Sequence, residues 1–227
     1  MSYQPVPQPQ VPYGPVATFK TRRGRLTEGQ SDALSRLFPV WGVRVEGQPL
    51  DLTALFGRKA PRVLDVGSGM GEATLAAADP DLDVLAVDVH TPGIATLLRG
   101  AEAAGLTNVR VADGDVRVLL ADMLPPASLT EVRVWFPDPW PKVRHHKRRL
   151  VTAGLLDLVA SRLQAGGVLS FATDWAPYAE QVAGLLEACP LKLVSRERPA
   201  TRPRTRFEQQ GLDAGRGAYD LVAQREL

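Results

Sequence analysis

The regular alternation of short β-rich runs with amphipathic helical segments is the feature that most constrains the fold of this chain. The strand-like runs are residues 62–66, 83–89, 109–112, 131–136 and 167–173. The helix-like segments are residues 71–79, 92–104, 116–123, 148–164 and 176–188. Such alternation predicts a parallel sheet with helices on both faces.

The C-terminal part of the chain departs from this alternation. Two strand-like runs, 191–194 and 218–224, have no helical pattern between them. The Arg-rich segment 196–217 is therefore expected to be a long loop, and loops of that length are usually functional or disordered. With these two runs, the sequence predicts an α/β Rossmann-like fold with a mostly parallel, seven-stranded sheet.

The composition is compatible with one folded domain preceded by a tail. The chain has 227 residues, 44% of them hydrophobic, which is enough for a substantial core. Residues 1–17 are rich in Pro and Gln and are expected to be disordered, because they bury too little apolar surface to fold. A single domain is expected over residues 18–227, with a basic arm at Lys20–Arg25 and a helix from Thr27.

The residue inventory argues against several classes of protein. The single cysteine, Cys189, cannot form an internal disulfide, and its apolar helical surroundings are typical of a packing role. Three histidines are too few for a convincing His-based metal cluster, so no metal is expected. The sequence has no run of apolar residues that could span a bilayer and no secretory leader pattern. A cytoplasmic, soluble protein is expected.

A glycine turn follows the first strand-like run, in "LDVGSGMGEATLA" at residues 64–76. Gly67, Gly69 and Gly71 would let the backbone turn tightly and approach a ligand. Asp88 lies 21 positions beyond Gly67, where a carboxylate can accept both ribose hydroxyls of an adenosine. A dinucleotide site would want glycine at position 72, where this chain has Glu72.

Carboxylates recur in or just after five successive strand-like runs. They are Asp65, Asp88, Asp115, Asp138 and Asp174. In a parallel sheet these strand ends share the edge where ligands bind, and several carboxylates there would repel a pyrophosphate. They would attract the cationic S-adenosylmethionine, which is therefore favoured over NAD. Helix capping is an equally good explanation for Asp115 or for Asp174 taken alone.

The segment "WFPDPWPKVRHHKRR" at residues 135–149 combines a rigid carboxylate with a run of cations. Pro137 and Pro139 restrict the backbone on both sides of Asp138, so its carboxylate is held in nearly one place. Trp140 could stack on a base or shape a pocket, or it could belong to the core of a merely rigid loop.

The cations of this segment are typical of a phosphate-binding surface. They are Lys142, Arg144, Lys147, Arg148 and Arg149, with His145 and His146 between them. Cations at the start of a helix oppose its dipole, so a solvated helix start explains them poorly and bound phosphate explains them well. A second basic wall is expected from Arg196, Arg198, Arg202, Arg204 and Arg206, and a third from the arm around Arg22 and Arg23. The carboxylate would then handle a reacting base while the cations hold the polymer that carries it.

At this point the chain resembles a known family. The matching segments are "RRGRLTEGQ" (22–30), "VDVHTPG" (87–93), "FPDPWPKVRHHKRR" (136–149), "ATDWAPYAE" (172–180), "RPRTRFEQQG" (202–211) and "GRGAYDL" (215–221). Together they resemble the bacterial tRNA (guanine-N7)-methyltransferases, over about residues 18–225. The Pro-Asp-Pro-Trp motif with its basic run is highly specific, whereas the glycine turn is not.

The resemblance implies a class I methyltransferase fold, S-adenosylmethionine as cofactor and the guanosine at position 46 of tRNA as target. It implies no obligate protein partner. By matching positions, it implies cofactor binding by Asp65, Asp88, Asp115 and Asp138, and catalysis by Asp138. It implies substrate binding by Lys142, Asp174, Thr205, Arg206, Phe207 and Glu208. It implies RNA contact by the residues from Arg144 to Arg149, which are Arg144, His145, His146, Lys147, Arg148 and Arg149.

This chain departs from the family pattern at five positions. The family usually has Glu where Asp65 and Asp88 stand, so cofactor contacts would be closer or bridged by water. Arg206 replaces a usual Lys, which changes the hydrogen-bond geometry. Pro141 stands where His or Lys is commoner, and Tyr219 replaces a usual Trp.

The expected mechanism is alignment rather than proton removal. Guanine N7 already carries a lone pair, so N7, the methyl carbon and sulfur need only be brought into line. Asp138 would hold the base through its N–H edge and stabilise the positive charge that develops on the ring. The alternatives are a methyltransferase acting on another RNA base, a non-catalytic RNA-binding relative and an NAD-linked oxidoreductase.

Overall fold

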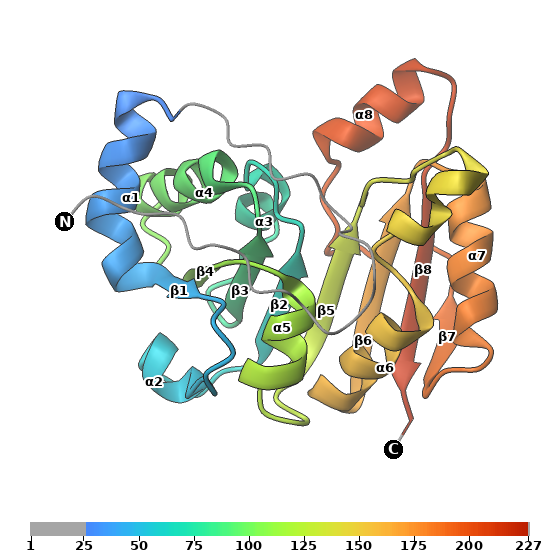
Figure 1. The fold of residues 1–227 in the computed structure, drawn as a ribbon, viewed down its shortest axis with the longest axis horizontal. Coiled ribbons are helices and arrows are strands. Elements are labelled where there is room, and N and C mark those ends of the chain that lie inside the picture. Colours follow the sequence, from blue (N-terminus) through green and yellow to red (C-terminus); the bar gives the residue numbers. More distant parts are fainter. Residues whose placement is uncertain (1–25, 227) are drawn as a thin grey trace. The chain divides into compact units, whose positions relative to one another are not determined.

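The computed structural model describes residues 26–226, whose helices and strands are drawn in Figure 1. These residues fall into two compact units, 26–125 and 126–226. The tail predicted at residues 1–17 and the basic arm with Arg22 and Arg23 lie outside the described residues.

The first unit carries four strands in the spatial order β1-β4-β3-β2, and all of its strand pairs are parallel. In chain order its elements are α1 (Glu28–Trp41), β1 (Gly42–Arg44), α2 (Leu52–Phe56), β2 (Arg62–Val66), α3 (Glu72–Ala76), β3 (Asp83–Asp88), α4 (Thr91–Ala103), β4 (Val109–Asp113), α5 (Val116–Val118) and η1 (Leu119–Met123). The last of these, η1, is a short π-helical turn that continues α5.

Local sequence explains how the first unit begins. Thr27 caps α1, because its side chain accepts from the Gln30 amide while the Gln30 side chain accepts from the Thr27 amide. The Gln30 side chain also donates to the Pro92 carbonyl at 3.3 Å and to the Thr96 hydroxyl at 3.2 Å, which ties α1 to the start of α4. Apolar side chains of α1, α4 and strands β2 to β4 then form one buried cluster that includes Leu34 and Ile94.

The second unit has the strand order β5-β6-β8-β7, with β5 and β6 parallel and the β6–β8 and β8–β7 pairs antiparallel. In chain order its elements are β5 (Leu129–Trp135), η2 (Val143–Arg148), α6 (Ala153–Arg162), β6 (Leu163–Thr173), α7 (Ala176–Leu186), β7 (Leu191–Ser195), α8 (Arg206–Asp213) and β8 (Tyr219–Arg225). Tyr178 of α7 is fully buried and packs edge-on against Phe171 of β6, with ring centroids 5.4 Å apart.

The predicted α/β, mostly parallel Rossmann-like architecture is confirmed, with some differences in the elements. The described residues contain eight strands, because β1 adds a three-residue edge strand beside β4. The segment 196–217 is not one loop, because Thr205 caps the helix α8 within it. Within residues 26–226, no helix is long and apolar enough to cross a membrane.

Candidate functional site

The glycine turn after β2 leaves open space next to its backbone. Gly67 and Gly69 have φ values of 76° and 56°, which favour glycine over other residues. A Cβ atom on Gly67 would meet nothing within 4 Å, and one on Gly69 would meet only the Gly67 carbonyl at 4.0 Å. The turn is therefore shaped so that a ligand can lie directly against the main chain.

The third glycine of the turn and a glycine in α4 make close packing possible. A Cβ on Gly71 would come within 2.7 Å of the Leu97 Cβ, so Gly71 lets α3 begin close against α4. A Cβ on Gly93 would come within 1.9 Å of the Gly69 carbonyl oxygen. Sequence reasoning did not assign Gly93 a role, although it ends the "VDVHTPG" segment that carried part of the resemblance.

Asp88 ends β3 and supports the glycine turn from the next strand. Its Oδ2 accepts from the Gly69 amide at 2.7 Å, and its Oδ1 accepts from the His90 amide at 2.8 Å. A carboxylate has about four acceptor sites, so each oxygen can still accept from a ligand hydroxyl. The carboxylate thus lies beside the open turn with acceptor capacity left.

Asp65 lies within β2 and is 4% exposed. Its Oδ2 accepts from the hydroxyl of Thr74, a fully buried residue of α3, at 2.5 Å. Asp113, which the sequence did not single out, is also buried and stands opposite Asp88 in the register of β3 and β4. Three carboxylates therefore lie on three adjacent parallel strands of the first unit.

The capping alternative describes the observed geometry of Asp115. Its carboxylate accepts from the Arg117 amide at 2.8 Å and forms an ion pair with the Arg117 guanidinium at 2.6 Å. The residue is 3% exposed, and its charge is compensated by this pair. Asp115 therefore adds less negative potential to the site than the sequence suggested.

In the second unit, the loop after β5 holds Asp138 between two strained residues. Phe136 and Trp140 have φ values of 54° and 43°, a region that non-glycine residues rarely occupy. Such residues cost about 1–3 kcal/mol each and persist where the surroundings enforce them, often at active sites. Asp138 itself is exposed and, within residues 26–226, accepts no hydrogen bond and forms no ion pair.

Contacts at both ends of this loop enforce its shape. The Phe136 amide donates to the Ala172 carbonyl at 2.7 Å, and the Arg202 guanidinium lies 5.4 Å from the Phe136 ring centre. At the other end, Arg149 Nε donates to the Pro139 carbonyl at 2.8 Å.

Trp140 lies among the basic residues that follow it. Its ring packs edge-on against His145 at 5.8 Å, and the Arg148 guanidinium lies 5.0 Å from the ring centre. The ring therefore has packing partners within the second unit, as the rigid-loop explanation required.

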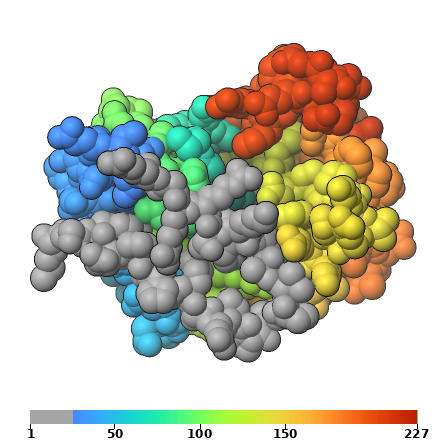
Figure 2. Space-filling model, turned by 45° about the horizontal axis from the view of Figure 1, so that its top comes forward, coloured from blue at the N-terminus to red at the C-terminus, as the bar shows by residue number. Residues whose placement is uncertain are grey.

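The basic run forms a separate 3-10 helix, η2, rather than the start of α6. Thr152 caps α6, and Lys147 and Arg148 lie in the last turn of η2, where they suit the helix dipole. Lys142, by contrast, is the N-cap residue of η2. The argument that the cations oppose a helix dipole is therefore wrong for Lys147 and Arg148. Lys142, Arg144 and Lys147 are exposed, and the segment that carries them is yellow in Figure 2.

The two histidines of the run are half-buried, and Arg148 is half-buried beside them. Partial burial, and then the charges of Arg144, Arg148, Lys142 and Lys147, lower the pKa of His145. His145 Nε2 accepts a long hydrogen bond, 3.4 Å, from Arg144 Nε.

The burial of Arg149 contradicts the prediction that it contacts RNA, because only 1% of the residue is exposed. Its side chain turns inward against α7 instead of toward solvent, where a phosphate could reach it.

Arg202 likewise is not part of a basic wall. It is 2% exposed, and its guanidinium pairs with Asp220 of β8 at 2.6 Å and with Glu208 of α8 at 2.8 Å. Arg198 pairs with the same Glu208 at 2.9 Å. The carboxylates of this network, rather than phosphate, neutralise these two cations, while Arg204 and Arg206 remain exposed.

The four-residue segment from Thr205 to Glu208 divides into two structural and two exposed positions. Thr205 caps α8 by accepting from the Glu208 amide at 3.0 Å, and both residues are buried. Arg206 is exposed, and 60% of Phe207 is exposed, on the helix that is red in Figure 2. The buried pair therefore fixes the helix that presents Arg206 and Phe207.

Asp174 follows β6 and does not cap α7. Its carboxylate pairs with Arg216 at 2.7 Å, and Gly211 of α8 approaches so closely that a Cβ there would lie 2.9 Å from the Asp174 Cβ. The capping alternative for Asp174 is thus wrong, and the residue instead connects the end of β6 to α8 and the segment after it.

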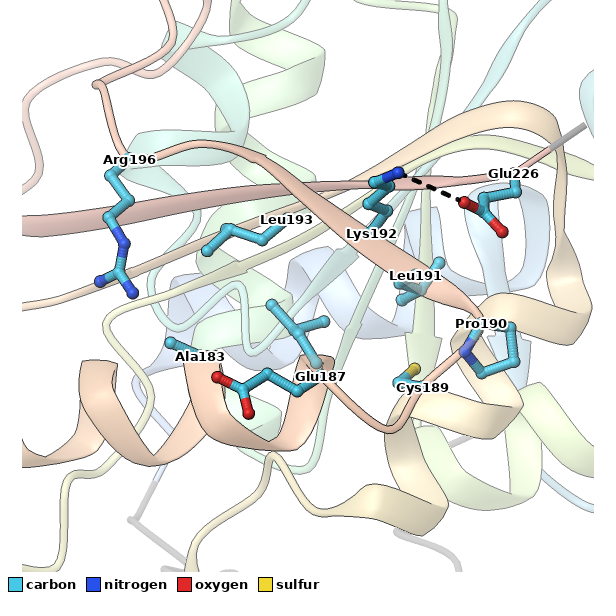
Figure 3. A pocket seen from close by; sticks show the side chains of 10 residues that line it. Ala183, Glu187, Cys189, Pro190, Leu191, Lys192, Leu193, Arg196 and Glu226 are labelled. Carbon is cyan, nitrogen blue, oxygen red and sulfur yellow. Dashed lines mark ion pairs between the residues drawn. The ribbon is translucent and has the colours of Figure 1, made fainter.

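A hollow of about 410 Å³ lies at the other end of the second unit, between the end of α7 and the edge strand β7 (Figure 3). Cys189 lines it, so the cysteine lies beyond the helix and is partly exposed instead of buried in a helical core. Burial raises the pKa of its thiol, which does not favour reactivity. Glu187, Lys192, Arg196 and Glu226 give the hollow charges of both signs. Residues 26–226 contain no group of three potential metal ligands.

The fold and the glycine turn are those of the class I, Rossmann-like methyltransferases. Residues 59–221 match a family described as putative methyltransferases. An Aquifex aeolicus SAM-dependent methyltransferase shares the fold with a TM-score of 0.51 at 15% identity, covering 77% of this chain and 87% of that one. The [4+2]-cyclase SpnF does so with a TM-score of 0.53 at 16% identity, covering 89% and 98%. Because a cyclase has this fold, the fold alone does not specify a reaction.

Closer relatives identify the family. A tRNA (guanine-N(7)-)-methyltransferase of Streptomyces avermitilis is 54% identical over 92% of this chain and 75% of its own length. One from Halorhodospira halophila is 51% identical over 90% of this chain and 93% of its own length. The chain belongs to the tRNA (guanine-N(7)-)-methyltransferase family.

Proposed function

We propose that this protein transfers a methyl group from S-adenosylmethionine to N7 of a guanosine in tRNA, and that the target is position 46 in the variable loop. The observation that carries the proposal is the 43–54% identity, over more than nine-tenths of the chain, to relatives named tRNA (guanine-N(7)-)-methyltransferase. The proposed place of action is the cytoplasm.

The residues of the first unit fit an adenosyl cofactor. The open glycine turn offers a main-chain surface at Gly67 and Gly69, and Asp88 offers carboxylate acceptors for two ribose hydroxyls. Asp65 and Asp115 are further proposed cofactor-binding residues. Asp65 supplies negative charge for the cationic methionine part of the cofactor. When bound, S-adenosylmethionine supplies an electrophilic methyl group on a sulfonium.

In the second unit, Asp138 is the proposed catalytic residue and a further cofactor contact. Guanine N7 carries a free lone pair, so the carboxylate has no proton to remove from it. Asp138 accepts from the N–H edge of guanine, orients the ring and stabilises the positive charge that arises there. A strained, doubly anchored loop suits this role, because a preorganised charge costs no rearrangement during the reaction.

The exposed residues of the second unit are the proposed tRNA contacts. Lys142, Arg144 and Lys147 suit phosphates, since their charges are accessible. Arg206 and Phe207 on α8 suit a phosphate and an unstacked base, respectively. Making N7 accessible costs a few kcal/mol of unstacking, which such contacts offset.

The decisive assay uses tritiated S-adenosylmethionine and unmodified tRNA transcripts with G or A at position 46. Label that enters only the G transcript, and creates a site cleavable by N7-specific chemistry, supports the proposal. Label in both transcripts would indicate another base or atom. Cofactor binding without label would indicate a different substrate, and absence of cofactor binding would favour a non-catalytic RNA-binding relative.

Asp138→Asn tests the role of the carboxylate with almost no change in shape. Turnover is expected to fall at saturating tRNA and cofactor, because the amide cannot compensate positive charge. Full turnover of this variant would exclude the proposed mechanism while leaving the substrate assignment intact.

A further inference from the structure

Arg149 is the last cation of the basic run, yet its environment differs from that of its neighbours. Lys142, Arg144 and Lys147 are exposed, whereas Arg149 is 1% exposed. It is the C-cap residue of η2, and its amide donates to the His146 carbonyl at 2.9 Å. This turn directs the side chain into the second unit.

The buried guanidinium joins the loop of Asp138 to α7. Its Nε donates to the Pro139 carbonyl at 2.8 Å, and its Nη1 donates to the side-chain oxygen of Gln181. It also lies over the Tyr178 ring, 4.7 Å from the centre. Tyr178 is itself fixed, because it is fully buried and its hydroxyl accepts from the Val151 amide at 3.0 Å.

The loop needs such an anchor on its C-terminal side. Pro139 has no amide hydrogen, so its carbonyl is its one backbone group that can form a hydrogen bond. The next residue, Trp140, has a φ of 43° and would relax without external contacts. Phe136, at the other end, already has the Ala172 carbonyl and Arg202 as partners.

We infer that Arg149 is a positioning residue, which holds the Pro139 carbonyl so that the neighbouring Asp138 carboxylate stays in its reactive orientation. Its charge serves this internal contact and not the phosphates of RNA. A planar guanidinium is required, because it donates to two acceptors at a fixed angle while stacking on a ring, which an ammonium cannot do. The inference rests on the proposed role of Asp138.

The salt dependence of tRNA methylation separates the two possible roles of this arginine. A lost phosphate contact raises KM and reduces the slope of log affinity against log salt concentration by about 0.7–0.9. A lost positioning contact lowers kcat and leaves that slope unchanged. For Arg149→Lys we expect kcat to fall about 10- to 100-fold, since small displacements of a reacting group have effects of that size.

Arg144→Gln is the matched control, because Arg144 lies in the same run and is exposed. Its main effect is expected on KM and on the salt slope. Gln181→Leu tests the same anchor without removing a charge, and its kcat is expected to fall as well. Far-ultraviolet circular dichroism and urea denaturation followed by tryptophan fluorescence verify that each variant is folded, since three of the four tryptophans lie in the second unit.

Arg149→Gln removes the charge in the same way as Arg144→Gln, so a reduced salt slope with unchanged kcat in Arg149→Gln would overturn the inference. Full activity of both Arg149→Lys and Gln181→Leu would overturn it as well. If the wild-type protein itself transfers no methyl group to tRNA, or if Asp138→Asn is fully active, it is the proposed function or mechanism that fails.

Discussion

Arg202→Met is expected to destabilise the second unit strongly, because it leaves two buried carboxylates without their shared cation. Asp220 and Glu208 are 6% and 4% exposed and lie 2.6 and 2.8 Å from the guanidinium. Breaking a buried ion pair costs about 3–5 kcal/mol. Glu208 keeps Arg198 as a partner, so the expected total is near that of one broken pair, about 4 kcal/mol.

The assay is urea denaturation followed by tryptophan fluorescence. Trp135, Trp140 and Trp175 all belong to the second unit, so three of the four tryptophans report on it. In a thermal scan the same loss of unfolding free energy corresponds to a fall in Tm of about 8–16 °C for a chain of this size. Arg204→Met, two residues away and exposed, is the control and is expected to change stability by less than about 0.5 kcal/mol.

The pH dependence of this stability loss tests whether the buried ion pairs cause it. Burial alone would raise the pKa of Glu208, but hydrogen bonds and charge from Arg202, then the charge of Arg198, lower it overall. A lowered native pKa contributes stability that is present above the unfolded value of about 4.3 and is lost as the pH falls through the native value. The loss of unfolding free energy caused by Arg202→Met should therefore be largest at pH 7 and become smaller below about pH 4. A deficit no larger than that of Arg204→Met, or one independent of pH, would refute this reasoning.

Three further predictions concern ligand binding. Gly93→Ala should weaken S-adenosylhomocysteine binding by about 1–3 kcal/mol in calorimetry, because the new Cβ displaces the Gly69 carbonyl. The control Gly29→Ala should have little effect, since its Cβ meets only a flexible side chain at 3.4 Å. Asp88→Asn should weaken the same binding by about 1.5–3 kcal/mol, and unchanged affinity would argue against a ribose contact. Burial and neighbouring cations lower the pKa of His145 and a bound phosphate raises it, so tRNA affinity in filter binding should rise as pH falls from 7.5 to 5.5. That pH dependence should shrink in His145→Asn.

Much of the central fold could be predicted from local sequence. The predicted strand at 62–66 has the same bounds as β2, and the predicted strand at 191–194 differs from β7 by one residue. These runs are short and mostly apolar and end at turn residues, so their signal is local. The short strand β1 and the helix α8 lack such a signal, because β1 is only three residues long and α8 lies in a polar, Arg-rich segment.

The candidate site shows the same division between local and tertiary information. The sequence by itself determined the glycine turn, the acids at the strand ends and the rigid frame around Asp138, since proline, glycine and strand boundaries act over a few residues. It could not distinguish Arg149 and Arg202 from the exposed cations around them, because an arginine in a polar segment has the same pattern whether it binds phosphate or a buried carboxylate. Only the tertiary structure decided their roles, since it brings Gln181 of α7 to Arg149 and Asp220 of β8 to Arg202, across 32 and 18 positions of the chain.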